Sequence, residues 1–200
     1  MNTSRIAATA ALTLLALTAC AGTSESTPAT PAGTRPSPAS SSAAASNIQR
    51  PATNDLVGEV SAEGARAFLY YYFDLKAYVL QTGDAAAVLE VLDGAASEQA
   101  EAERLKAVYD GGGWVLGGQP KVENVYLTTP EDEVVEGADV TALIPVNPDA
   151  YTEFAEDGAV AEQRPFSPAG TIYTATVRYA DGAWKVTSLE ETPDAVLPEA

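Results

Sequence analysis

The spacing of apolar residues changes at about residue 113, and this change constrains the fold more than any other feature. Between Ser61 and Tyr109 apolar residues recur every three or four positions, as on one face of a helix. Between Ala138 and Ser188 they recur at every second position, as on one face of a strand. Helices followed by antiparallel strands are typical of an α+β domain. We therefore expect N-terminal helices packed on one face of a curved antiparallel sheet.

The helical half divides into three segments at glycine-containing breaks. A long helix is expected from Ser61 to Thr82, where Gly83 can end it. Residues 85–93 predict a short second helix with Asp84 as its N-cap, and a third helix is expected over 97–109. The run 111–113 is Gly-Gly-Gly and should stop the third helix.

The second half predicts strands over 122–128, 138–146 and 173–179. Asp181-Gly182 between two alternating segments indicates a type I′ hairpin turn. The stretch 147–170 separates two strands by more than twenty residues, with one helical turn expected at 151–155. Connections of this length are often functional, so this one is interpreted either as a lid or partner surface, or as an excursion held by its aromatic residues.

The order of these elements resembles the cone-shaped α+β fold of ketosteroid isomerase and nuclear transport factor 2, also called SnoaL-like or cystatin-like. The resemblance rests on the long first helix, the Gly83-Asp84 step and the hairpin 177–186. The chain also resembles a family of actinobacterial lipoproteins of unknown function, through its N-terminal signal, its Glu63-Gly64-Ala65 helix start and its segment 112–118. The first resemblance implies a fold with an internal pocket, and the second implies no activity.

The N-terminus has the pattern of a bacterial lipoprotein signal. Arg5 precedes an apolar run of about twelve residues, and Leu17-Thr18-Ala19-Cys20 resembles a lipobox. A spanning helix needs roughly 20 apolar residues, which disfavours a transmembrane interpretation. We expect cleavage after residue 19, acylation (palmitate) of Cys20, and attachment to the extracytoplasmic face of the cell membrane.

A linker is expected after the acylated cysteine. Of residues 21–50, 24 are Ala, Gly, Ser, Thr or Pro, and none is aromatic. Such a composition cannot bury enough apolar surface to fold, and it predicts a disordered tether. The expected domains are thus a signal peptide (1–19), a lipidated linker (20–54) and one α+β cone domain (55–200).

The composition narrows the chemistry. The chain has no histidine, and Cys20 is its only cysteine, so no His-based triad and no Cys/His metal site is predicted, nor any cofactor. The formal net charge is −17, which disfavours nucleic acid and anionic lipid headgroups as partners. The lipid on Cys20 is therefore the expected membrane attachment. No oligomeric state is predicted.

Aromatic residues are the candidate binding groups. Five of the six residues 68–73 are aromatic, and on a helix they point to all sides. They are interpreted as lining an aromatic-walled cavity for a small apolar ligand, or else as filling the core. The predicted ligand-binding residues are Tyr70, Tyr71, Tyr72, Tyr109 and Trp114.

Three hypotheses for function follow from these observations. The first is a non-catalytic lipoprotein of the cell envelope that binds a small apolar ligand or another envelope protein. The second is an isomerase- or lyase-type enzyme with Asp74, Asp84 or Asp139 facing a tyrosine hydroxyl in the cone. The third is a purely structural envelope module. No residue set forms a catalytic signature, so the first hypothesis is preferred and no catalytic residue is assigned.

Overall fold

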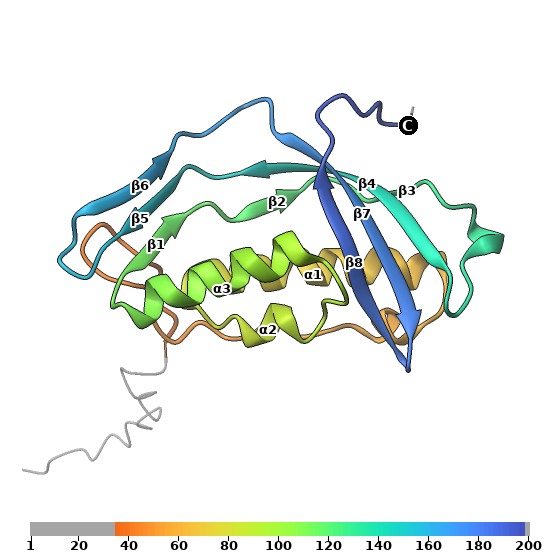
Figure 1. Ribbon diagram of the computed structural model, residues 1–200, viewed down its shortest axis with the longest axis horizontal. Coiled ribbons are helices and arrows are strands. Elements are labelled where there is room, and N and C mark those ends of the chain that lie inside the picture. The colour runs from red at the N-terminus through yellow and green to blue at the C-terminus, as the bar shows by residue number, and fades with distance from the viewer. Residues whose placement is uncertain (1–34, 199–200) are drawn as a thin grey trace, which may run out of the picture. The chain divides into compact units, whose positions relative to one another are not determined.

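The computed structural model describes residues 35–198. The predicted signal peptide, Cys20 and the part of the predicted linker before residue 35 lie outside these residues. The described chain has helices first and an antiparallel sheet afterwards, which confirms the α+β class. The elements are η1 (Asp55–Gly58), α1 (Ala62–Thr82), α2 (Ala86–Leu89), α3 (Ala96–Asp110), β1 (Trp114–Gly117), β2 (Pro120–Val122), β3 (Tyr126–Leu127), η2 (Glu131–Glu133), β4 (Asp139–Pro148), β5 (Tyr151–Phe154), β6 (Val160–Arg164), β7 (Thr171–Ala180) and β8 (Ala183–Glu191). Figure 1 shows the strands curving over the helices.

Helix α1 begins and ends as its sequence predicts. The Ser61 hydroxyl accepts a hydrogen bond from the Gly64 N–H at 3.0 Å and so caps the first turn. Gly83 ends the helix in the left-handed conformation, with its N–H bonded to the Val79 carbonyl. Glycine is also required at position 64, because a β-carbon there would lie 2.1 Å from the Glu59 carbonyl oxygen.

The strands form two groups that continue into one another. Their orders are β1-β5-β6 and β2-β4-β7-β8, with β3 also paired to β4, and every pair is antiparallel. The chain passes directly from β1 to β2, from β4 to β5 and from β6 to β7, so each of these pairs resembles one long strand with a break. Two of the breaks are bonded to each other, through Gly118 N–H to the Ala150 carbonyl (3.0 Å) and Asp149 N–H to the Gln119 carbonyl (3.3 Å).

Gly117 makes the bend at this break. Its φ is +77°, and a β-carbon at this position would lie 1.9 Å from the Ala150 carbonyl oxygen. Only glycine combines this backbone conformation with so close an approach. Residues 114–117, for which the sequence predicted no strand, form a strand that ends at the bend.

The core lies between the helices and the inner face of the larger strand group. Alternate residues of β4, β7 and β8 face inward, including Ile144, Val177 and Val186, all fully buried. The expected hairpin turn joins β7 to β8, with φ of +53° at Asp181 and +81° at Gly182. Positive φ at both central residues is the signature of a type I′ turn, as predicted.

Two local expectations were wrong. The stretch 147–170 is not a long loop, since it holds β5 and β6, and residues 151–154 are a strand and not a helical turn. These strands are short and paired to each other and to β1, so their sequence has no clear alternation. Asp84 does not cap α2, which covers only Ala86–Leu89; its carboxylate accepts a hydrogen bond from the Tyr78 hydroxyl at 3.1 Å instead.

Residues 35–54, which composition assigned to the linker, contact the folded domain. Ser37 and Ser46 exchange backbone hydrogen bonds of 2.9 Å, and the Ser40 carbonyl accepts one from the Trp114 indole N–H at 2.8 Å. Arg50 forms a 2.6 Å ion pair with Glu90. The segment is held through its backbone and one charge, and composition carries no signal for such contacts.

Candidate functional site

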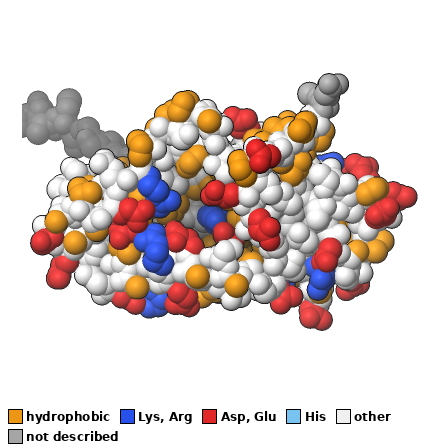
Figure 2. Space-filling model, turned by 45° about the horizontal axis from the view of Figure 1, so that its top comes forward, with side chains coloured by type: hydrophobic (Ala, Val, Ile, Leu, Met, Phe, Trp, Pro, Cys, Tyr) orange, Lys and Arg blue, Asp and Glu red, His pale blue; other side chains and the backbone are white. Residues whose placement is uncertain are grey.

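An open cavity of about 760 Å³ lies between α1, α3 and the inner face of the strands. This volume falls within the range of about 300–1,000 Å³ that is typical of small-molecule sites. Figure 2 shows a hollow on this face, with Lys and Arg side chains in and beside it and acidic side chains around them. The cavity reaches the junction of β1 with β2 and of β4 with β5, so the Gly117 bend helps to shape it.

Much of the cavity wall is apolar. The residues that form it lie on the inward-facing sides of the helices and strands. Helices α1 and α3 supply one side, and β4 and β8 supply the other. The apolar lining residues are Phe73, Val79, Leu80, Val88, Ala102, Leu105, Val146 and Leu189. Most of them are also core residues, so the cavity is an opening in the core and not a surface groove.

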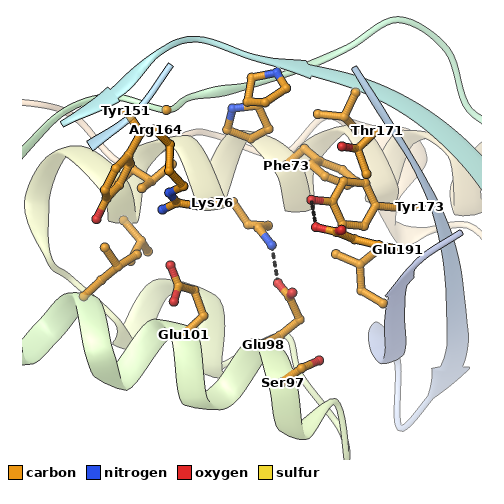
Figure 3. Close-up of a pocket in the computed structure, with 18 of the residues that line it drawn as sticks. Phe73, Lys76, Ser97, Glu98, Glu101, Tyr151, Arg164, Thr171, Tyr173 and Glu191 are labelled. Atoms are coloured by element: carbon orange, nitrogen blue, oxygen red, sulfur yellow. Dashed lines mark hydrogen bonds and ion pairs between the residues drawn. The ribbon is translucent and has the colours of Figure 1, made fainter. Parts of the chain in front are cut away.

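A buried charged network forms one wall of the cavity. Glu98 of α3 pairs with the Lys76 ammonium (Figure 3). Glu98 also accepts a hydrogen bond from the Tyr72 hydroxyl, and both of its partners lie on α1. The Lys76 and Glu98 side chains are only 21% and 11% exposed. Burial and the neighbouring Glu98 carboxylate raise the pKa of Tyr72 well above its ordinary value, so this hydroxyl remains a donor.

A second network links α3 to β5. Arg104 donates to Glu101 at 2.8 Å, to Glu153 at 2.6 Å and to the Tyr151 hydroxyl at 3.1 Å. The Tyr151 hydroxyl in turn donates to Glu153 at 2.6 Å. Burial and this hydrogen bond to Glu153 raise the pKa of Tyr151 to about 12.

The charge of Glu153 is maintained by these partners. Burial alone would raise the pKa of Glu153, but hydrogen bonds from Tyr151 and Arg104 outweigh burial and lower that pKa. Glu153 is therefore ionised at neutral pH, and its network with Arg104 is a permanent part of the wall.

A third polar pair, Tyr173 and Glu191, lies on the opposite side of the cavity (Figure 3). The two residues are directly opposite each other on β7 and β8, and the Tyr173 hydroxyl donates to Glu191 at 3.3 Å. Burial, followed by the charge of Glu191, raises the pKa of Tyr173 to about 12. The ring of Phe73 lies next to Tyr173, with 6.2 Å between the ring centroids.

The structure does not bring the five predicted binding residues together in the cavity. Tyr70 is 39% exposed, and Tyr71 is half-buried against the core. The Tyr109 hydroxyl donates to the Leu80 carbonyl at 2.7 Å, and Trp114 stacks on Phe154 at 5.0 Å outside the cavity lining. Only Tyr72 touches the site, through its hydroxyl on Glu98.

The three aspartates considered for catalysis also lie outside the cavity lining. All of them are exposed. Asp139 forms a 2.7 Å ion pair with Arg178, and Asp84 accepts a hydrogen bond from Tyr78. The carboxylates in the cavity lining are Glu98, Glu101, Asp149, Glu162, Glu190 and Glu191, which the sequence alone did not distinguish from solvated surface positions. One signal was present: Glu98, Glu101 and Leu105 follow helical spacing and share a face of α3.

Within residues 35–198, no group of three acidic, histidine or cysteine side chains is placed to hold a metal ion. No helix among these residues is both long and apolar enough to cross a membrane.

Taken together, the fold and the cavity define a class of protein: an α+β domain whose helices and curved antiparallel sheet enclose an open, partly charged cavity. The chain belongs to a protein family of unknown function, DUF6318, whose model matches residues 35–190. That match begins within the segment that contacts Trp114. No curated protein matches the chain.

Two solved structures are similar to this chain at low sequence identity. One is the intermembrane space region of the chloroplast protein ARC6, at 14% identity and a TM-score of 0.46, covering 66% of this chain and 97% of that one. The other is a putative aromatic ring hydroxylase from Novosphingobium aromaticivorans, at 16% identity and a TM-score of 0.41, covering 65% and 89%. Both TM-scores are below 0.5, and no functional inference depends on either similarity.

Proposed function

We propose that this protein is a cell-envelope lipoprotein whose SnoaL-like cone domain binds a small, largely apolar molecule without transforming it. The observation that carries the proposal is the open cavity of about 760 Å³ with its preformed apolar wall.

The polar groups of the cavity support binding over catalysis. Each basic side chain in its lining, Lys76, Arg104 and Arg164, is already paired with a glutamate. The tyrosines beside them have raised pKa values and act as donors, so none of them is a base near neutral pH. The isomerase or lyase alternative named Asp74, Asp84 and Asp139 as its carboxylates, and all three are exposed outside the cavity lining.

Ligand binding can be tested with 1-N-phenylnaphthylamine, an uncharged apolar dye whose fluorescence rises in an apolar site. The protein would be the full chain carrying Cys20→Ser, which avoids bound lipid and detergent. Ala102 is buried at the cavity wall, so Ala102→Phe should fill the space and weaken dye binding at least about tenfold. The matched control is Ala100→Phe, an exposed site on the same helix, which should leave binding unchanged.

A second blocking variant protects this test against misfolding. Ser97 is exposed and lies at the cavity lining, so Ser97→Phe should obstruct the cavity without disturbing the core. Dye binding of equal strength in all four proteins would show that the dye, and by extension an apolar ligand, does not use the cavity.

The lipoprotein part of the proposal rests on Leu17-Thr18-Ala19-Cys20. In a bacterial host fed an alkyne-labelled palmitate, the wild-type chain should take up the label and sediment with membranes. Cys20→Ser should abolish labelling and leave the protein as a precursor or release it, while Thr23→Ser should behave as wild type. A Cys20→Ser protein that is labelled, or is processed and still membrane-bound, would contradict the proposed anchor.

A further inference from the structure

We infer that the ligand of the cavity carries a positively charged group, and that Tyr173 and Glu191 form the subsite that receives this group. The inference rests on the proposed ligand-binding function and specifies the chemical class of the ligand: an organic cation, such as an amine, with an apolar body. It is based on the surroundings of Lys76 and Arg164, which each lie beside an aromatic ring and a glutamate at the cavity.

Two cations of the protein itself lie beside an aromatic face and a carboxylate at the cavity, Lys76 mostly buried and Arg164 exposed. The Lys76 ammonium pairs with Glu98 and lies 5.8 Å and 6.0 Å from the ring centroids of Tyr72 and Phe73. A cation at such distances is attracted by the electron-rich face of the ring.

The second of these cations is Arg164 on β6. The Arg164 guanidinium carbon lies 4.0 Å from the centroid of the Tyr151 ring, and its Nε is 3.1 Å from a Glu162 oxygen. Lys76 and Arg164 come from different elements, so the repeated arrangement reflects the character of the wall and not a single local motif.

Tyr173 and Glu191 form a third aromatic–carboxylate pair, and this one holds no cation of the described chain. Glu191 has no ion-pair partner among residues 35–198, and its one contact from another side chain is the Tyr173 hydroxyl at 3.3 Å. The ring of Phe73 provides a second aromatic surface beside it. The pair faces the cavity (Figure 3), so a cationic group of a bound molecule could reach both the carboxylate and the rings.

The charge balance of the cavity also favours a cation over an anion. Its basic side chains are Lys76, Arg104 and Arg164, and each is already neutralised by a glutamate. Glu190 and Glu191 also line the cavity, and neither has an ion-pair partner among residues 35–198. An anionic ligand finds no unpaired base in this lining, whereas a cation finds unpaired carboxylates.

The apolar body of the ligand has a defined place. Leu189, Val146 and Leu105 line the same cavity as the Tyr173–Glu191 pair. A molecule with its charge at Glu191 can therefore place a short hydrocarbon chain against apolar side chains of β4, β8 and α3.

Three probes with the same hydrocarbon chain separate charge from apolar contact: hexyltrimethylammonium, 1-hexanol and hexane-1-sulfonate. Their binding to the full chain carrying Cys20→Ser can be measured by displacement of 1-N-phenylnaphthylamine. The expected order of affinity is ammonium, then alcohol, then sulfonate, with the ammonium roughly tenfold tighter than the sulfonate. Added salt should reduce this preference.

A pair of matched substitutions assigns the preference to one side chain. Glu191→Gln should weaken ammonium binding about three- to tenfold and leave the alcohol unchanged. Glu103→Gln removes the same charge from an exposed position on α3 outside the cavity lining, and it should have no effect.

The possible results separate the cationic subsite from the apolar ligand-binding site. If the dye binds in the cavity but the sulfonate binds as tightly as the ammonium, or if both glutamine variants have equal effects, the cationic subsite is refuted and the apolar site stands. If neither the dye nor any hexyl probe binds, the proposed ligand-binding function itself is refuted.

Discussion

Replacement of Gly117 by alanine tests whether the bend in the sheet is required for the fold and the cavity. Two separate costs are expected at this position. A left-handed conformation costs an L-residue about 1–2 kcal/mol. The added β-carbon would also lie 1.9 Å from the Ala150 carbonyl oxygen, which forces the backbone of one strand to move.

Gly137 provides a control that separates the two costs. Its φ of +80° is nearly that of Gly117 (+77°), but a β-carbon there would meet no atom within 4 Å. Gly137→Ala should therefore cost only the conformational term, about 1–2 kcal/mol. Gly117→Ala adds an overpacking cost of about 1–3 kcal/mol, for a total of about 2–5 kcal/mol.

These energies convert to measurable shifts in melting temperature. For a domain of this size, 1 kcal/mol corresponds to about 3 °C. Thermal unfolding followed by circular dichroism should show Tm falling about 4 °C in Gly137→Ala and about 10 °C in Gly117→Ala. The Gly117 variant should also bind the apolar dye more weakly, because Ala150 adjoins Tyr151 at the cavity wall, whereas Gly137 lies away from the cavity lining.

Two results would contradict this account of Gly117. Equal losses of stability in the two variants would mean that the strands can shift apart at the bend without cost, so the close approach would not be a constraint. Normal dye binding in a destabilised Gly117→Ala protein would show that the bend does not shape the cavity.

Three further predictions concern individual side chains. Tyr72→Phe removes the buried hydroxyl that donates to Glu98 and should lower the free energy of unfolding by about 1–2 kcal/mol in urea titrations; no change would mean that water or Lys76 replaces it fully. The pKa of Tyr173 is about 12 in the folded protein against roughly 10 when unfolded, so its stabilising contribution is complete below about pH 10 and is lost as pH rises through about 12. Tyrosinate absorbance should therefore show two groups ionising near 12, Tyr151 and Tyr173, and one of them should be missing in Tyr173→Phe. Trp114→Phe removes the indole donor to the Ser40 carbonyl and should make the alanines at 43–45 more sensitive to elastase, and an unchanged cleavage rate would contradict a role of this bond in holding the segment.

The parts of the fold predicted from sequence are those encoded by neighbouring residues. The Ser61 hydroxyl caps α1 within its own first turn, and Gly83 ends the same helix. Asp181-Gly182 determines the β7–β8 turn through backbone conformation alone. In each case the signal and its structural effect lie within about four residues, so a sequence reading can recover them.

The strands β5 and β6 could not be predicted in the same way. All five residues Val160–Arg164 are exposed, so no alternation of apolar and polar residues marks the strand. Strand β5 pairs with β1, which lies almost forty residues earlier in the chain. The pairing depends on the bend at Gly117, and a pair of glycines in a sequence equally well indicates an ordinary turn.

The candidate site was missed for a related reason. The predicted binding residues were aromatic, but an aromatic ring can pack against another ring instead of lining a cavity. Trp114 does so by stacking on Phe154. The charged residues of α3 look like a solvated helix face until α1 and β5 are placed beside them. Lys76 and Glu98 are 22 residues apart, and their pairing is a consequence of tertiary packing.

The charged networks explain why the cavity remains open in a domain without disulfides. The Lys76–Glu98 pair spans α1 and α3, and the Arg104–Glu153 pair spans α3 and β5, so both cross between the walls of the cavity. If α3 moved onto the sheet, the apolar walls would gain contact, but these ions would lose their remaining water at a cost of several kcal/mol each. Removal of one partner would also leave the other charge unpaired inside. Collapse is therefore opposed at two separate points, and the apolar wall remains available to a ligand that can bring its own counter-charge to Glu191.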